Sequence, residues 1–173
     1  MTRPELSSAW LRLIPLTVEE VNFYLRQDFS FEKHFGLTLH PRSVPENVQK
    51  ALRERVLARI EADPENHLFY TLWAAIDKEI NTVVAGIVFK SPPNENGEVE
   101  LGAGTLDGFM NRGYMTETTK LLCGWALKNG VKNIVANCTP ENVASQRTLE
   151  KCGFEIVKKE EQNWNWRYRG LKN

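Results

Sequence analysis

The chain is organised around the stretch Gly108-Phe109-Met110-Asn111-Arg112-Gly113-Tyr114-Met115-Thr116-Glu117. It lies between a strand-like run, residues 99–106, and an apolar-periodic helix, residues 116–128. A strand that turns sharply into a helix directs several backbone N–H groups and the positive end of the helix dipole at one point. Gly113 lets a ligand approach that point without a Cβ in the way, and Arg112 adds a positive charge. The stretch therefore suits a phosphate group, although many strand–helix turns with a glycine bind nothing.

Length and composition set the broad class. With 173 residues, 42% of them hydrophobic, the chain can bury a sizeable core, and we expect residues 1–173 to form a single domain. The 22 basic and 22 acidic residues cancel, so no net charge attracts nucleic acid or an anionic membrane. No apolar run approaches the roughly 20 residues that span a bilayer, and the first residues lack the apolar stretch of a secretory signal. We therefore expect a cytoplasmic protein.

The cysteines and histidines argue against a disulfide framework and against a metal site. The cysteines are odd in number and lack Cys-x-x-Cys spacing, which is typical of reduced thiols in a cytosol. The histidines are scattered along the chain without the spacing of metal ligands. The residues concerned are Cys123, Cys138, Cys152, His34, His40 and His67.

The N-terminal part predicts one strand and two helices. Residues 10–16 alternate weakly as a strand does, and Thr17-x-x-Glu20 is a capping box that starts a helix to about residue 27. Residues 28–44 lack a clear period and predict either a loop over a site or an irregular helix packed on the core. Ser43-x-x-Glu46, with Pro45 in the first turn, predicts a second helix, which ends at residues 63–66. Its apolar face holds Val48, Leu52, Val56 and Ile60.

The rest of the chain predicts six more strands and two more helices. The first three strands are separated by polar turns and indicate an antiparallel meander. Together these elements predict an α/β (mixed α+β) fold, with a central twisted sheet of six to seven strands flanked by about four helices. The strands cover residues 68–76, 83–89, 98–106, 133–138, 154–158 and 163–169, and the helices cover residues 116–128 and 142–151.

A second informative stretch runs from Thr139 to Phe154 and contains Asn-x-x-Ser followed by Leu-Glu-Lys-Cys-Gly-Phe. Upstream, in family order and spacing, stand Glu100-Leu101-Gly102-Ala103-Gly104 and Gly113-Tyr114-Met115-Thr116-Glu117. On these residues the chain resembles the GNAT superfamily of acyl-CoA-dependent N-acetyltransferases, and within it the RimJ/RimL-like branch of ribosomal-protein N-terminal acetyltransferases. The resemblance in element order covers about residues 11–168, and it is motif-specific over residues 98–154. It implies a GNAT-like fold.

The resemblance also implies acetyl-CoA as co-substrate, with no metal. In the family a Gln/Arg-x-x-Gly-x-Gly/Ala motif cradles the pyrophosphate with backbone amides, and here it falls on residues 110–115. Met110 replaces the usual Gln or Arg, a departure that Arg112 is placed to offset. The residues expected to bind the co-substrate are Leu106, Asn111, Arg112, Gly113, Tyr114, Met115, Thr116, Asn142 and Ser145.

Glu100 is the candidate general base. A protonated amine cannot attack a thioester, so a group must take its proton. On a strand Glu100 shares a face with Gly102 and Gly104, which leaves room for a substrate. The alternative is that Glu100 belongs to the solvated face of an edge strand. Backbone N–H groups near Leu106 are expected to stabilise the oxyanion.

Four further residues have more than one interpretation. Ser145 matches the family's candidate for protonating the departing thiolate, or is an ordinary helix residue. Asn142 holds the pantetheine arm in the family, but asparagine also favours the N-cap. Tyr114 is a second candidate proton donor, although packing against the cofactor suits its place better. Cys138 is best interpreted as a buried structural thiol, since no histidine lies close in sequence to activate it.

These observations predict an acetyltransferase that moves acetyl from acetyl-CoA directly to a primary amine in a ternary complex. The acceptor is either a protein N-terminus or a small-molecule amine such as a polyamine, amino acid or antibiotic. The alternative is a non-catalytic acyl-CoA-binding sensor or interaction module with the same fold. A phosphotransferase is disfavoured because the central loop lacks the Gly-Lys-Ser/Thr ending of a P-loop. The alternating aromatics Trp164, Trp166 and Tyr168 are core packing or a homodimer surface.

Overall fold

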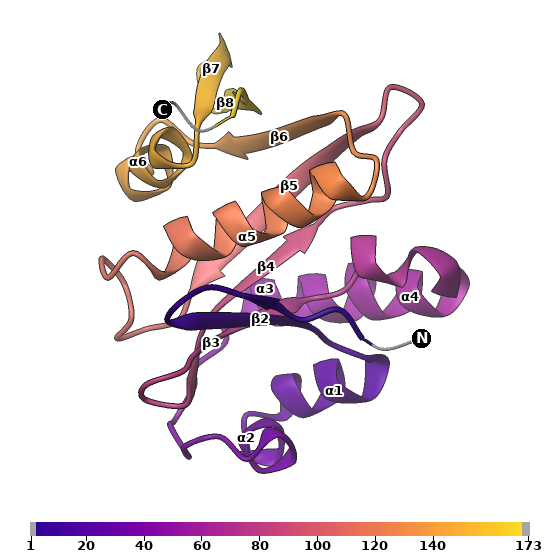
Figure 1. The fold of residues 1–173 in the computed structure, drawn as a ribbon, viewed down its shortest axis with the longest axis vertical. Coiled ribbons are helices and arrows are strands. Elements are labelled where there is room, and N and C mark those ends of the chain that lie inside the picture. Colours follow the sequence, from indigo (N-terminus) through magenta and orange to yellow (C-terminus); the bar gives the residue numbers. More distant parts are fainter. Residues whose placement is uncertain (1–2, 171–173) are drawn as a thin grey trace.

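The computed structural model describes residues 3–170, and in this range it contains an eight-stranded mixed sheet and six α-helices (Figure 1). The strands are β1 (Leu6–Ser7), β2 (Leu11–Pro15), β3 (Trp73–Asp77), β4 (Thr82–Phe89), β5 (Glu98–Thr105), β6 (Asn133–Cys138), β7 (Phe154–Lys159) and β8 (Trp164–Tyr168). The helices are α1 (Val18–Arg26), α2 (Ser30–Phe35), α3 (Glu46–Ala51), α4 (Ala58–Ala62), α5 (Tyr114–Lys128) and α6 (Val143–Lys151). The mixed α/β class is confirmed, but the sheet and the number of helices are larger than predicted.

The sheet has the strand order β1-β2-β3-β4-β5-β6-β8-β7. The predicted meander is confirmed, since β3, β4 and β5 pair as antiparallel neighbours. The pairing of β5 with β6 is parallel, and the other pairings in the described chain are antiparallel. The strand missing from the prediction is β1, which has two residues and so carries no periodic pattern.

The helix α1 begins at the predicted capping box. The Thr17 hydroxyl accepts a hydrogen bond from the Glu20 N–H (3.3 Å), and the Glu20 carboxylate accepts one from the Thr17 N–H (2.8 Å). Two of the N–H groups that a helix start leaves unpaired are thus satisfied. The Glu20 carboxylate also accepts hydrogen bonds from the Arg3 guanidinium at 2.6 and 2.7 Å, which attaches the start of the described chain to α1.

Residues 28–44 form the short helix α2 and an extended segment that pack on the core, as the second of the two interpretations predicted. The Arg42 guanidinium donates to the Glu32 carboxylate (2.6 Å), and both side chains are only 2% exposed. It also donates to the Tyr24 carbonyl (2.8 Å) and lies 4.3 Å from the centroid of the Tyr24 ring. A buried ion pair with additional hydrogen bonds holds this irregular segment in place.

The capping box predicted at Ser43 is wrong. The helix α3 begins at Glu46, and its N-cap is Pro45, which has an extended backbone and no side-chain hydrogen bond. Proline suits the start of a helix because its fixed φ is already helical. It also has no N–H, and an N–H at this position would have no partner within the helix. Ser43 therefore stands outside the cap and is exposed.

The helical segment from α3 to α4 contains a π-helical section, η1 (Leu52–Leu57), and is followed by a 3₁₀ helix, η2 (Pro64–Phe69). The predicted apolar positions Leu52, Val56 and Ile60 are buried, whereas Val48 is 40% exposed. π-helical insertions are often found at functional sites, and the apolar period gave no sign of this one.

The helix α5 covers one face of the sheet, and the segment from α3 to α4 lies on the opposite face with α1 (Figure 1). Trp125 of α5 packs on the aromatic rings of the sheet, with its centroid 5.0 Å from that of Trp73 and 6.2 Å from that of Phe89. On the other face Gly86 and Val88 of β4 and Gly102 of β5 lack bulky side chains, so that the helix above them does not close on the sheet. This is where a cavity forms.

Candidate functional site

The strands β5 and β6 separate before β5 ends. Their pairing runs from Glu98 with Asn133 to Leu101 with Ala136, whereas β5 continues beside β4 as far as Thr105. Because parallel strands point the same way, the loops that follow β5 and β6 leave from the same edge of the sheet. The unpaired end of β5 thus forms one side of a gap that opens towards both loops.

The backbone of Ala103 and Thr105 faces this gap. The Glu100 carbonyl accepts a hydrogen bond from the Lys90 N–H on the β4 side (2.8 Å), and the Leu106 N–H donates to a β4 carbonyl (2.9 Å). Successive residues of a strand direct their backbone groups to opposite sides, so even-numbered residues of β5 face β4 and odd-numbered residues face β6. Past Leu101 the odd-numbered residues have no strand to pair with.

The oxyanion donors are predicted near Leu106, and the Leu106 N–H is itself not free to be one, because it is bonded to the Val84 carbonyl (2.9 Å). The Leu106 carbonyl accepts a hydrogen bond from the Phe109 N–H (3.1 Å), and the side chain is buried against the cavity described below. Ala103 and Thr105 are the candidate donors. Sequence reasoning placed the donors only near Leu106, because their identity depends on strand register, which no residue pattern reveals.

The N-terminus of α5 is open to a ligand. Its N-cap is Gly113, with a φ of 81° and no side-chain hydrogen bond to the cap. A Cβ added at Gly113 would meet only the tip of the Trp10 ring, at 4.0 Å. Asn111, with a φ of 60°, and Arg112 are exposed on the same loop. The first N–H groups of a 15-residue helix are thus directed at a point that an anion can reach.

Phe109 anchors the loop. It is buried, with its ring centroid 5.1 Å from that of His40 and 6.0 Å from that of Tyr114. Arg112 lies with its guanidinium carbon 5.7 Å from the Phe109 centroid. Met110, at the position where the family usually has Gln or Arg, is 56% exposed. The loop is therefore held by the packing of Phe109, whereas the Met110 side chain extends into solvent.

The Tyr114 side chain is directed from the start of α5 into the protein, towards β3, and its packing against the cofactor stays a prediction. The buried Tyr114 hydroxyl donates to the Asp77 carboxylate (2.7 Å). Burial would raise the pKa of Asp77, but hydrogen bonds from the Tyr114 hydroxyl and from the Ile80 and Glu79 amides outweigh it and lower that pKa. Burial and the bond to Asp77 raise the pKa of Tyr114. Asp77 thus positions the first residue of α5, and nothing in the sequence pattern linked the two.

The helix α6 begins beside this edge of the sheet. Asn142 is its N-cap, and the Asn142 side-chain oxygen accepts a hydrogen bond from the Ser145 N–H (3.1 Å). The capping interpretation of Asn142 is confirmed, and its side-chain amide group is left to face solvent. Ser145 is half-buried in the first turn. Met115 and Thr116 lie in the first turn of α5, and the Thr116 carbonyl accepts a hydrogen bond from the Cys152 thiol at the end of α6 (3.4 Å).

Glu100 lies on the face of β5 that carries Gly102 and Gly104. The Lys90 ammonium forms an ion pair with the Glu100 carboxylate, and the Asn137 side-chain amide donates to the same carboxylate oxygen at 2.7 Å. The side chain is 28% exposed, so it is in contact with solvent but not free to turn. Sequence reasoning missed both partners. The one available signal was the register of the β4–β5 hairpin, which places Lys90 opposite Glu100.

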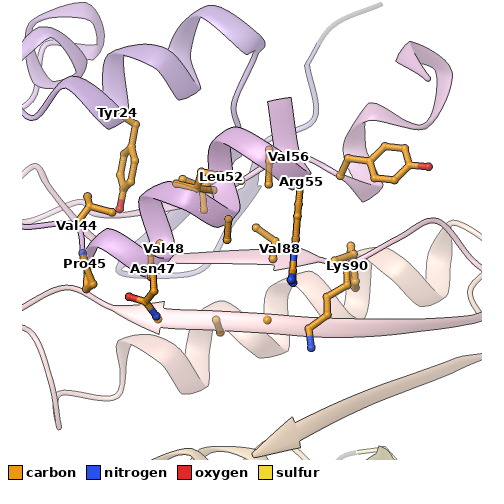
Figure 2. A pocket seen from close by; sticks show the side chains of 18 of the residues that line it. Tyr24, Val44, Pro45, Asn47, Val48, Leu52, Arg55, Val56, Val88 and Lys90 are labelled. Carbon is orange, nitrogen blue, oxygen red and sulfur yellow. The ribbon is translucent and has the colours of Figure 1, made fainter. Parts of the chain in front are cut away.

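A cavity of about 460 Å³ lies between β4, β5 and the segment from α3 to α4 (Figure 2). Its floor includes Gly102 and Gly104, and Lys90, the partner of Glu100, lines one end. The walls are mostly apolar, with Val44, Val48, Leu52, Val56, Leu72 and Leu106 among them. A volume of this size suits a small ligand or the end of a peptide. Tyr24, which Arg42 holds in place, forms part of the wall at the α1 side.

Cys138 is buried at the end of β6, where its sulfur accepts a hydrogen bond from the Trp166 indole (3.1 Å). Burial raises the pKa of Cys138, and the Trp166 hydrogen bond only partly offsets this. The thiol is thus held in its protonated form, as expected of a structural residue.

Metal-binding clusters and membrane-spanning helices are both missing from residues 3–170. No cluster of three or more histidine, cysteine, aspartate or glutamate side chains in this range has the geometry to hold a metal ion. Within the same residues, no helix combines the length and apolar character that crossing a bilayer requires.

Comparison with protein families gives a match to the acetyltransferase (GNAT) domain over residues 11–155. Among curated proteins the chain is similar to an uncharacterized N-acetyltransferase, YjdG, from Bacillus subtilis. The two are 36% identical over 97 residues, which is 56% of this chain. The match spans 58% of that relative's length.

Solved structures share the fold at low sequence identity. The ribosomal-protein-S5-alanine acetyltransferase from Vibrio fischeri superposes with a TM-score of 0.68 at 11% identity, covering 98% of each chain. The RimL ribosomal L7/L12 acetyltransferase, solved in complex with coenzyme A, has a TM-score of 0.69 at 15% identity. That likeness covers 97% of this chain and 98% of the RimL chain.

Proposed function

Because this chain belongs to the GNAT acetyltransferase family, an acyltransferase family, we propose that it transfers an acetyl group from acetyl-CoA to a primary amine by direct attack in a ternary complex. One observation carries the proposal. The gap between β5 and β6, the uncapped N-terminus of α5 and the cavity beneath α3 meet at one edge of the sheet. A donor and an acceptor can thus reach the same point from opposite sides.

The donor occupies the gap and the start of α5. The N–H groups of residues 113–116, with the positive end of the helix dipole, bind the pyrophosphate. Arg112 adds its charge at the rim. The pantetheine arm carries amide groups, which pair with those backbone groups of Ala103 and Thr105 that the oxyanion does not use. The amide group of Asn142 borders the arm from α6.

The acceptor amine enters from the cavity, and Glu100 takes its proton. The amine nitrogen then forms a bond to the thioester carbonyl carbon, and the N–H of Ala103 or Thr105 stabilises the oxygen that becomes negative. The C–S bond breaks as the carbonyl re-forms, and Ser145 supplies a proton to the departing thiolate. The second proton that the nitrogen loses as it becomes an amide passes through water to Ser145, which restores the hydroxyl. Lys90 and Asn137 position the Glu100 carboxylate and do not touch the reacting atoms. The RimL structure with coenzyme A supports this choice of donor.

The first test is thermal unfolding with and without about 1 mM acetyl-CoA, beside ATP and NAD. A ligand at 100 times its Kd adds roughly 2.7 kcal/mol of stability, and each kcal/mol raises Tm by roughly 2–4 °C in a domain of this size. We expect a rise of several degrees with acetyl-CoA and none with ATP or NAD. An assay of thiol release with a panel of amines then tests transfer.

The two assays also separate the proposal from its alternative. A sensor or interaction module would be stabilised by acetyl-CoA and would release no thiol with any amine. A protein that acetyl-CoA does not stabilise would contradict both proposals.

Replacing Gly113 by alanine is expected to weaken acetyl-CoA binding about tenfold, which equals the loss of roughly one charge-assisted hydrogen bond of about 1.5 kcal/mol. The new Cβ stands at the start of α5, and the positive φ strains an alanine by about 1–2 kcal/mol, so the N–H groups lose their alignment. Isothermal titration calorimetry measures the affinity.

Gly130→Ala is the matched control. Gly130 has a φ of 87°, also with open space around it, and follows the other end of the same helix. We expect both variants to lose similar stability, and only Gly113→Ala to lose affinity. Equal affinities would show that the start of α5 does not hold the pyrophosphate.

A further inference from the structure

The charged residues that line the cavity in the described chain are all positive. Among the described residues that line the cavity, three carry a positive charge and none is an aspartate or a glutamate. The three are Arg55, Arg59 and Lys90. Lys90 is neutralised by its ion pair with Glu100, so the two arginines on the helical side set the net charge that a bound molecule meets.

Neither arginine has a carboxylate partner in the described chain. Arg59 donates a hydrogen bond to the Lys90 backbone carbonyl, which joins the helical segment to the end of β4. Asp63, which also lies near Arg59, is bonded instead to Tyr70 (3.4 Å) and Asn66 (2.9 Å). Arg55 extends from η1 towards the strands, with Lys90 on the strand side of the cavity (Figure 2). Two guanidinium groups therefore border the cavity with donors to spare.

The helical period accounts for the presence of Arg55 on this wall, since residues three and four apart share a face. Leu52, Arg55 and Val56 all line the cavity and all belong to η1. Arg53, in the same section, points to a different surface, where it lies beside α1 and near the Gln49 side chain. The helix thus presents apolar and cationic groups together on the cavity side.

We propose that the acceptor is a primary amine with an apolar body and an anionic group, and that Arg55 and Arg59 bind that group. This inference rests on the proposed acetyl transfer and names its substrate class. The ammonium end lies towards Glu100 on the sheet, the apolar body fills the cavity, and the carboxylate or phosphate lies against the guanidinium groups. Arginine suits both anions because its planar fork binds two oxygens at once.

The same wall selects against polycations. A polyamine or an aminoglycoside antibiotic would place a second ammonium group beside Arg55 and Arg59, where like charges repel. Of the acceptors considered from the sequence, this cavity fits amino acids and those protein N-termini that carry an acidic group.

The test uses amines of matched shape that differ in one group. Leucyl-glycine carries a carboxylate, leucyl-glycinamide is its neutral counterpart, and leucyl-aminomethylphosphonate carries a phosphonate. Spermidine represents the polycations. Binding of each to the protein saturated with coenzyme A is measured by calorimetry, so that the result does not depend on turnover. We expect one or both anionic peptides to bind at least tenfold more tightly than the amide, with a preference that falls as ionic strength rises.

Arg55→Gln is expected to remove most of this preference by weakening binding of the anionic peptides tenfold, while affinity for the amide stays unchanged. Arg53→Gln, the same substitution on the same helical section, is the matched control and leaves all affinities unchanged. Both residues are exposed and lack ion pairs in the described chain, so both variants are expected to fold. Comparison of the carboxylate with the phosphonate shows which anion the site prefers.

Equal affinity for the acid and the amide, tighter binding of spermidine, or no binding of any of the four amines would overturn the inference. An equal effect of Arg55→Gln and Arg53→Gln on the anionic peptides would overturn the role of Arg55. These results are distinct from failure of the proposed function. Acetyl transfer to spermidine would support the proposed acetyltransferase activity and exclude the anionic acceptor. A preference for anions without any thiol release would support the anion-binding site and exclude the acetyltransferase activity.

Discussion

Replacement of Glu100 by glutamine is expected to lower kcat for acetyl transfer roughly 10²–10⁴-fold, because an amide cannot take a proton from the acceptor amine. Glutamine has nearly the same shape, and its oxygen can still accept the hydrogen bond from Asn137. The affinity for acetyl-CoA should therefore stay unchanged, since the start of α5 is untouched. Steady-state kinetics and calorimetry on the same preparation measure both quantities.

Glu98→Gln is the control for this experiment. Glu98 lies on the same strand and the same face, and its carboxylate accepts a hydrogen bond from Arg167 (3.1 Å). We expect it to keep kcat within a small factor of the unaltered protein. The deficit of Glu100→Gln should narrow as the pH approaches the pKa of the acceptor amine, because the free amine then needs no base. A deficit that is the same at every pH, or a loss of less than tenfold, would make Glu100 a structural link between β4, β5 and β6.

Replacement of Arg42 by methionine is expected to lower the free energy of unfolding by about 3–5 kcal/mol, because it leaves the Glu32 carboxylate buried without its partner. Both side chains are only 2% exposed, so water cannot take the place of the guanidinium. The Tyr24 carbonyl also loses a donor at 2.8 Å, and the ring loses the cation stacked on it. Urea denaturation followed by tryptophan fluorescence measures the change.

Two further variants separate burial from charge. Lys50→Met removes an ion pair with Glu54 whose side chains are 70% and 62% exposed, and it should change stability by less than about 1 kcal/mol. Replacing Glu32 by leucine in the Arg42→Met background should recover part of the loss, since a buried pair can often be exchanged for apolar groups. If Arg42→Met costs no more than Lys50→Met, the ion pair does not hold residues 28–44 on the core.

Much of the fold follows from local chemistry that is visible in the sequence. The Thr17 capping box starts α1, Gly130 takes a positive φ after α5, and β6 has the bounds that its β-branched run predicts. Each of these predictions depends only on a residue and its neighbours in the sequence. Where two local rules competed, at Ser43 and Pro45, the rigid ring of proline decided the position of the cap.

The candidate site could be predicted only where sequence motifs identify its residues. The positive φ and the open side of Gly113 agree with the prediction of a bare helix start, because glycine adopts this backbone conformation without strain and adds no side chain to cover it. The face shared by Glu100 and Gly104 followed from strand alternation alone. The partners of the Glu100 carboxylate could not be predicted from the sequence, because Lys90 and Asn137 reach it through the register of two neighbouring strands.

The direction of a side chain at an element boundary was also beyond the sequence. Tyr114 stands at the centre of the motif, but its hydroxyl is directed into the protein towards Asp77, and only the packing of α5 against the first strands decides this. The cavity depends on contacts of the same long range. The chain between residues 44 and 62 carries an ordinary apolar period, and nothing in it indicates the π-helical section or the open space that Arg55 borders.

The early separation of β5 and β6 also bears on how the protein behaves when it is handled alone. Unpaired backbone groups along a strand are a template for any extended chain, and sheets normally confine them to short, guarded outer edges. Here Ala103 and Thr105 present such groups inside the sheet, on a stretch with small side chains that shield them little. A molecule bound there in the place of a strand would cover these backbone groups. We therefore expect the protein without coenzyme A to be the form most prone to self-association, and purification and storage in the presence of coenzyme A to reduce aggregation.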